Sequence, residues 1–215
     1  MTILIAIPCM DTVPIAFAES LLNLDKPEGT KVCFKSGSLI YDARNLISLT
    51  AIENNFDYVM WLDSDMKFPY DTLTTLLKDL NDNNAQIISG LYFKRRLPTA
   101  PVIYKLLDEP KKNNKGVLER QLESYDDYPT KSIFPIQGAG FGCMLMRTSV
   151  LKRVWDKFGP AFAPLPWGGE DISFCYRVKQ LGIPMLCDSR VKCGHIGQFN
   201  YSEELYNMTR SDDHA

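Results

Sequence analysis

The sequence predicts an α/β protein with a mostly parallel central sheet flanked by helices. Two continuous apolar runs, TILIAIP at residues 2–8 and FDYVMWL at residues 56–62, are typical of strands buried on both faces. Other segments carry apolar residues at helical spacing, as Leu73, Leu76 and Leu77 do. A chain that alternates helices with such strands forms a parallel sheet, and ligands bind beyond the carboxyl ends of its strands.

The expected elements follow in chain order. We expect strands at residues 2–8, 31–34, 56–62, 85–93, within 134–147, and at 183–193. We expect helices at residues 42–55, 71–80, 148–159, and after the Pro/Gly-rich loop that begins at residue 164, with an end at Gly182. The chain therefore begins, in this prediction, with the order strand, strand, helix, strand.

The length of the chain favours one main domain. It has 215 residues, 45% of them hydrophobic, which is enough for one sizeable core. We expect this domain to cover residues 1–200, with a turn-rich hairpin or flap at residues 98–135. Residues 201–215 are predicted to form a polar tail that frays toward its end.

Composition excludes several classes of function. The formal net charge of −2 gives no basic field of the kind that attracts nucleic acid. The six cysteines have no zinc-like spacing, and buried free thiols in a reducing compartment explain them. The first residues lack a basic region before the apolar run, and no apolar stretch is long enough to span a bilayer. We therefore expect a soluble, cytoplasmic protein with no nucleic-acid partner and no integral membrane segment.

Two aspartates, Asp63 and Asp65, directly follow the apolar run at residues 56–62. Carboxylates at positions i and i+2 of an extended chain point to opposite sides, so both reach one ligand only if the backbone turns at Ser64. With such a turn, one carboxylate can bind a hard divalent cation and the other a sugar hydroxyl or a metal-bound water. The alternative is an ordinary turn at the end of a strand, where Asp and Ser are common.

Glu170 and Asp171 follow Trp167, Gly168 and Gly169 at the predicted start of a helix. Two glycines allow a loop to approach a ligand closely, and the helix dipole stabilises carboxylates in the first turn. A carboxylate held there can accept a proton from an attacking hydroxyl. Stabilisation of the helix end alone would explain the same two acids.

His195 follows the last predicted strand, directly after Gly194. An imidazole together with carboxylate oxygens suits Mn²⁺ and several other divalent cations. A purely structural histidine is the competing interpretation.

The order of these motifs resembles that of a known family. DARN before a helix, then YVMWLDSDM, GAGFGCMLMRTSVL, GGEDISFCYRVKQLG and finally VKCGH, is similar to the motif order of GT-A fold glycosyltransferases, and most of all to the family 2-like group. The resemblance extends from the first strand to His195 and depends on the ordered set of motifs. It implies a Rossmann-like GT-A domain and an enzyme of the hexosyltransferase type.

The resemblance also implies a role for each motif. The base and ribose of a nucleotide-sugar donor would lie against the first strand, which ends at Pro8, and against the strand before the D-x-D motif. Mn²⁺ or Mg²⁺ would be held by Asp65 and His195 against the diphosphate, with Asp63 toward the ribose or a metal-bound water. Arg44 would lie near the nucleotide or its phosphates.

The acidic pair of the family corresponds to Glu170 and Asp171. Asp171 would be the general base of an inverting transfer, and Glu170 would contact the acceptor. The loop of Trp167, Gly168 and Gly169 would contribute to an acceptor site for an unidentified glycan, protein or small molecule.

The sequence departs from the family pattern at Lys35 and Ser36, where members carry an acidic residue for the nucleotide base. UDP is therefore only the default nucleotide. Two other functions remain open, a non-catalytic module that binds nucleotide-sugar on the same fold and a nucleotidyltransferase. The second lacks the Gly-rich basic loop that would hold a triphosphate after the first strand.

Overall fold

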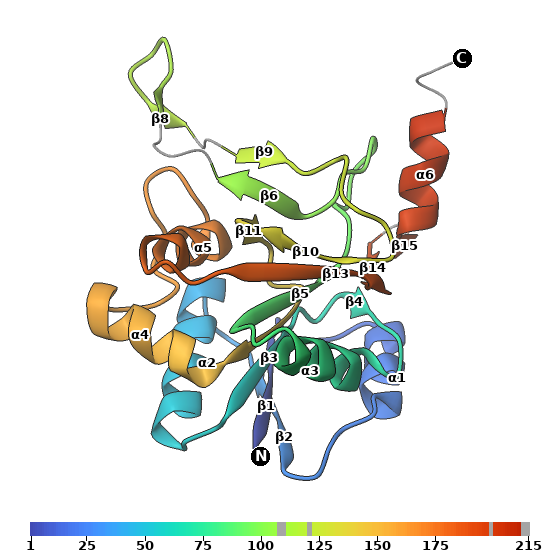
Figure 1. Cartoon of the computed structure of the whole chain (residues 1–215), viewed down its shortest axis with the longest axis vertical. Helices are drawn as coiled ribbons and strands as arrows, with labels where there is room; N and C mark the ends of the chain where they lie inside the picture. The colour runs from blue at the N-terminus through green and yellow to red at the C-terminus, as the bar shows by residue number, and fades with distance from the viewer. Residues whose placement is uncertain (107–110, 120–121, 198–199, 212–215) are drawn as a thin grey trace.

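A computed structural model of the chain describes residues 1–106, 111–119, 122–197 and 200–211. Its central layer is a seven-stranded sheet, shown in Figure 1. In chain order its strands are β1 (Ile3–Pro8), β2 (Thr30–Lys35), β3 (Tyr58–Leu62), β5 (Ile87–Leu91), β10 (Ile133–Ile136), β12 (Cys143–Arg147) and β13 (Met185–Lys192). The helices are α1 (Ile15–Asn23), α2 (Ile40–Glu53), α3 (Thr72–Asp82), α4 (Thr148–Phe158), α5 (Glu170–Gln180) and α6 (Glu203–Ser211).

The strands lie in the order β10-β13-β5-β12-β3-β1-β2. β1, β2, β3, β5 and β13 point in one direction, and β10 and β12 run opposite to them. Helices cover both faces of this sheet (Figure 1). The predicted α/β fold with a mostly parallel central sheet is therefore confirmed.

Side-chain alternation along each strand divides the core into two layers. Ile3, Ile5 and Ile7 of β1 are buried in the cluster that contains α1 and α3, whereas Leu4 and Ala6 are buried with α2, α4 and α5. Because the central strands are buried on both faces, they read as continuous apolar runs in the sequence.

The strand order reverses between β1 and β3. From β1 the chain passes through α1 to β2 on one side, and from β3 it passes through α3 to β5 on the other. Connections that leave in opposite directions open a crevice at the carboxyl ends of the two strands. Pro8 and Asp63 lie at these two ends, so the topology alone places them beside a possible ligand site.

Three short strands form a small sheet of their own. β4 (Met66–Lys67) pairs with β14 (Gly194–Ile196), which pairs in turn with β15 (Asn200–Tyr201).

In the 98–135 segment, β6 (Ile103–Leu106) pairs with β9 (Leu122–Ser124) and with β11 (Gly138–Ala139). β7 (Lys111–Lys112) pairs with β8 (Leu118–Glu119). Residues 107–110 and 120–121 of this predicted hairpin lie outside the described residues.

Two elements differ from the prediction. The start of the chain is strand, helix, strand, because parallel β1 and β2 require a crossover, which α1 provides. Part of the predicted tail is helical, because Tyr206 of α6 is buried against Phe93 at a ring distance of 4.7 Å. Residues 212–215 of the tail lie outside the described residues. None of the helices in the described part of the chain is both long and apolar enough to cross a membrane.

Candidate functional site

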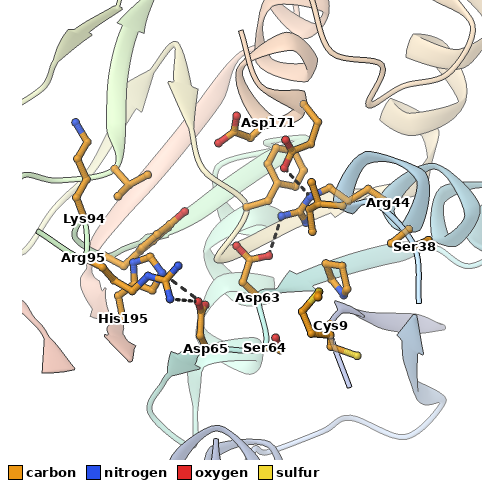
Figure 2. A pocket seen from close by; sticks show the side chains of 18 residues that line it. Cys9, Ser38, Arg44, Asp63, Ser64, Asp65, Lys94, Arg95, Asp171 and His195 are labelled. Atoms are coloured by element: carbon orange, nitrogen blue, oxygen red, sulfur yellow. Dashed lines mark hydrogen bonds and ion pairs between the residues drawn. The ribbon is translucent and has the colours of Figure 1, made fainter. Parts of the chain in front are cut away.

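A cavity of about 500 Å³ opens where β1, β3 and β5 end, and we call it the main cavity (Figure 2). Its lining comes from segments far apart in the sequence, because the ends of neighbouring strands meet at one edge of the sheet. The lining residues are Pro8, Cys9, Met10, Ser38, Ile40, Ala43, Arg44, Asp63, Ser64, Asp65, Tyr92, Lys94, Arg95, Val102, Phe141, Glu170, Asp171 and His195.

Asp63 is paired with a buried arginine. Arg44, on α2, donates a hydrogen bond of 2.7 Å from Nη2 to Oδ1 of Asp63, and its Nε lies 3.5 Å from Oε1 of Glu170. The guanidinium also lies over the rings of Phe141 and Trp61, at 5.1 and 5.6 Å from their centroids. Arg44 therefore holds Asp63 and Glu170 toward each other from beneath the main cavity.

The charge of Arg44 is maintained by its neighbours although the side chain is only 2% exposed. Burial lowers the pKa of the guanidinium, but the carboxylates of Asp63 and Glu170 raise it by more, so the net shift is upward. Nε and Nη1 of Arg44 are buried without a hydrogen-bond partner among the described residues. A buried donor without a partner is costly, so these atoms are candidates for contact with an anionic ligand.

Asp65 is paired with an exposed arginine. Nη1 of Arg95, on the loop after β5, lies 2.8 Å from Oδ2 of Asp65, and Nε2 of His195 lies 3.5 Å from Oδ1 (Figure 2). The pairing of β4 with β14 brings His195 to this place, since Met66 and His195 are partners in that ladder. Burial raises the pKa of Asp65, but His195 and Arg95 lower it by more, so the carboxyl stays ionised.

Asp65 and His195 fit a divalent cation. Nδ1 of His195 lies 2.9 Å from the carbonyl oxygen of Phe93, and because a carbonyl only accepts, Nδ1 must carry a proton. A cation would bind the neutral imidazole, in which the lone pair is then on Nε2, the atom that faces Asp65. Among the described residues, Oδ1 of Asp65 is buried without a hydrogen-bond partner. In the described part of the chain no group of three or more His, Cys, Asp or Glu side chains could hold a metal ion. Other ligands would have to come from the substrate or water.

Asp171 differs from the other carboxylates of the main cavity. It lies in the first turn of α5, where its Oδ1 accepts a hydrogen bond of 2.7 Å from the backbone N–H of Ile172. Burial is the largest influence on its carboxyl and raises its pKa, and the charge of Glu170 raises it further. A raised pKa makes the ionised carboxylate a better proton acceptor at neutral pH.

Glycines in GAGFG make room for an aromatic wall. A Cβ atom on Gly140 would lie 2.1 Å from the hydroxyl of Tyr92, and one on Gly142 would lie 2.8 Å from its ring. Tyr92 accepts a hydrogen bond from the N–H of Gly142 and packs edge-on against the ring of His195. Gly140 and Gly142 therefore allow the backbone to pack closely against Tyr92, which forms one side of the main cavity.

Seven residues singled out in the sequence meet in the main cavity: Pro8, Arg44, Asp63, Asp65, Glu170, Asp171 and His195. Trp167, Gly168 and Gly169 do not line it. The ring of Trp167 packs edge-on against Tyr176, and Gly168 is buried below the start of α5. Their expected contact with an acceptor stays a prediction.

Sequence reasoning missed the basic loop of Lys94 and Arg95 and the wall residue Tyr92. A signal was present, because Lys94, Arg95 and Arg96 directly follow a predicted strand whose carboxyl end lies at the ligand-binding edge. The ion pair between Arg95 and Asp65 could not be predicted from residue spacing, because the two residues follow different strands.

The fold and the cavity define an α/β protein, similar in fold to GT-A proteins, with a candidate ligand site at the carboxyl edge of its sheet. Comparison of the sequence with protein-family models finds no match, and a search of curated proteins also finds none.

Among solved structures, the chain is similar to A197 from STIV, with 18% identity and a TM-score of 0.66, over 92% of this chain and 86% of that one. It is also similar to GalNAc-T7, solved with UDP, GalNAc and Mn²⁺, with 10% identity and a TM-score of 0.58. That match covers 91% of this chain and 43% of GalNAc-T7, so the chain spans less than half of that protein. At these identities the likeness shows the fold.

Proposed function

We propose that the chain is a metal-dependent glycosyltransferase that moves a sugar from a nucleotide-sugar, with UDP as the default nucleotide, to an acceptor hydroxyl. The observation that carries the proposal is the arrangement in one cavity of two chemically different acidic centres. Asp65 faces His195 with a buried oxygen that has no hydrogen-bond partner among the described residues, whereas Asp171 is a buried carboxyl with a raised pKa. The presence of UDP, GalNAc and Mn²⁺ in GalNAc-T7, which has a similar fold, supports this choice of ligands.

Asp65 and His195 would hold Mn²⁺ or Mg²⁺. When bound, the cation supplies Lewis-acid stabilisation of the negative charge on the leaving nucleoside diphosphate. Asp63, fixed by Arg44, would accept a hydrogen bond from the ribose or from a metal-bound water. Pro8, at the end of β1, would contact the nucleotide.

Asp171 would act as the general base. The acceptor oxygen forms a bond to the anomeric carbon of the sugar while the bond from that carbon to the diphosphate oxygen breaks. The hydroxyl proton passes to Asp171, and the nucleoside diphosphate leaves with the electron pair. Attack from the side opposite to the leaving group inverts the anomeric configuration. Glu170 would contact the acceptor.

The first test is a thermal-shift panel of UDP, GDP, CDP and TDP and their sugars, each with Mn²⁺, Mg²⁺ or EDTA. We expect one nucleotide to raise the melting temperature only when metal is present, because ligand binding to the folded state stabilises it. No response to any nucleotide would contradict the proposal.

The second test separates catalysis from binding. Asp171→Asn should lower transfer by roughly 10²- to 10⁴-fold and leave the metal-dependent nucleotide shift unchanged, since a general base contributes about that factor. Asp156→Asn is the matched control, because Asp156 is an exposed carboxylate paired with Lys152 on α4. Nucleotide binding without transfer in the unmodified protein would favour the non-catalytic binding module.

A further inference from the structure

A second cavity, of about 450 Å³, lies beside the main one, and we call it the loop cavity. It is lined by the basic residues after β5 and by side chains of the β6–β9 pair. These residues are Lys94, Arg95, Arg96, Tyr104, Leu122 and Ser124. Lys94 and Arg95 also line the main cavity, so the two cavities are neighbours. Figure 2 shows both side chains on one side of the main cavity, across from Arg44.

The loop that carries the three cations is held closed by hydrogen bonds. The N–H of Lys94 donates to the carbonyl of Ala100 at 2.9 Å. The carbonyl of Lys94 accepts from the N–H of Arg96 at 2.9 Å and from the hydroxyl of Thr99 at 2.7 Å. Thr99 is buried, whereas Lys94 and Ala100 are half-buried and Arg96 is exposed. Three adjacent cations are therefore presented from a fixed backbone, which lowers the entropy cost of binding a ligand.

The loop cavity is positively charged although the chain as a whole has a net charge of −2. Half of its described lining residues are cations, and no carboxylate is among the described lining residues. The ammonium of Lys94 lies 5.1 Å from the ring centroid of Tyr104. Arg95 is engaged with Asp65, whereas Arg96 forms no ion pair with any residue that the structure describes. Ser124 also donates its hydroxyl to Asp126, at 2.9 Å, which places that carboxylate beside the lining.

We propose that the loop cavity binds a phosphate group carried by the acceptor substrate. A phosphate monoester has close to two negative charges at neutral pH and three strong acceptor oxygens, which suit a lining that contains three basic side chains. The ring of Tyr104 and the side chain of Leu122 offer apolar contact to the part of the molecule that carries the phosphate. The volume is in the range of small-ligand sites.

Lys94 and Arg95 line both cavities and so connect the proposed phosphate site to the main cavity. A molecule whose phosphate lies in the loop cavity can extend past Lys94 and Arg95 into the main cavity, which Asp171 also lines. The assignment of this phosphate to the acceptor substrate rests on the proposed function, whereas a phosphate site in the loop cavity does not depend on it.

The experiment measures binding of phenyl phosphate by titration calorimetry at neutral pH and low salt. Arg96→Gln and Lys94→Gln should each weaken binding roughly tenfold, because each removes a charge-assisted hydrogen bond to the phosphate. Lys105→Gln is the matched control. It removes the same charge from the next position after Tyr104 on β6, where Lys105 pairs with Glu123 and faces away from the cavity. Equal affinity in all four proteins would overturn the proposal.

Competition with UDP and Mn²⁺ distinguishes this site from the donor site. We expect phenyl phosphate to bind with unchanged affinity in the presence of saturating UDP and Mn²⁺. Mutual exclusion would overturn the proposal, because it would assign the cations to the donor diphosphate. If UDP and Mn²⁺ do not bind while phenyl phosphate binding still depends on Arg96, the proposed function fails and the phosphate site stands.

Vesicles distinguish the two sources of such a phosphate. Phosphatidylcholine vesicles with and without phosphatidic acid are compared by sedimentation, again with Arg96→Gln and Lys105→Gln. Capture that requires both phosphatidic acid and Arg96 identifies a lipid phosphate. Binding of phenyl phosphate without capture identifies a soluble phosphate ester.

Discussion

The two aspartates of the D-x-D motif are held by two very different arginines. Asp63 is paired with Arg44, which is 2% exposed, comes from α2 and lies among aromatic rings. Asp65 is paired with Arg95, which is 48% exposed and comes from a loop. Removing one partner of a buried ion pair is strongly destabilising, whereas separating an exposed pair changes the free energy of folding little. We therefore expect Asp63 to serve in positioning and Asp65 to exchange its partner for a ligand.

The largest effect is expected on the Asp63 side. Arg44→Met should lower the free energy of unfolding by about 3–5 kcal/mol, because it leaves the carboxylates of Asp63 and Glu170 without their buried partner. Denaturant unfolding measures this. A loss below about 1 kcal/mol would show that Arg44 is not the structural partner described above.

The second prediction compares the aspartates directly. Asp65→Asn should weaken Mn²⁺-dependent UDP binding by at least about tenfold, because an amide is a poorer ligand for a hard cation than a carboxylate. Asp63→Asn should retain the metal requirement, since Asp63 is engaged with Arg44. Calorimetry with UDP, with and without Mn²⁺, measures both. If both variants lose the metal requirement equally, Asp63 is also a metal ligand.

The third prediction concerns Asp171 and its neighbour. Activity should rise with pH as Asp171 ionises, and this rise should lie above the ordinary pKa of an aspartate because burial and the charge of Glu170 raise its pKa. Glu170→Gln removes that charge, so the pKa falls and the rise moves to lower pH. The pH dependence of kcat/KM measures the shift. A rise that stays at the same pH in Glu170→Gln would exclude Asp171 as the titrating group.

The smallest effect on stability is expected for Arg95. Arg95→Met should change the free energy of unfolding by less than about 1 kcal/mol, because its ion pair with Asp65 is partly exposed. It should tighten Mn²⁺ binding in the absence of nucleotide, because a competing cation is removed from Asp65. Electron paramagnetic resonance of free Mn²⁺ measures the affinity. Weaker Mn²⁺ binding in the variant would contradict the view that Arg95 competes with a cation for Asp65.

Helices and strands were predicted correctly where burial produces a recognisable pattern of apolar residues in the sequence. The apolar runs of β1 and β3 and the leucine stripe of α3 were predicted because each is buried over its length or along one face. α1 was missed because Ile15 and Leu22 are exposed, which obscures the stripe around Phe17. α6 was missed because its sequence is largely polar, and its buried residues among those described are one aromatic residue, Tyr206, and one acidic residue, Glu203.

The ends of predicted strands indicated which residues line the main cavity, but the sequence did not indicate which side chains pair with one another there. Asp63, Asp65 and Asp171 could be chosen from their places after a strand or at the start of a helix, and they line one cavity. Their chemical roles stay predictions. The resemblance placed Arg44 near the nucleotide, but the pairing of Asp63 with Arg44 and of Asp65 with Arg95 could not be predicted, because these contacts depend on how separate elements pack.

The pairing of β4 with β14 also determines when the site can form during synthesis. Asp65 leaves the ribosome well before His195, and the two meet only when residues near 66 and 195 join in one ladder. An incomplete chain that ends before β14 contains both aspartates of the motif and still lacks the imidazole beside Asp65. Binding of Mn²⁺ to this pair would therefore report that the chain has been made through β14 and that β4 and β14 have paired.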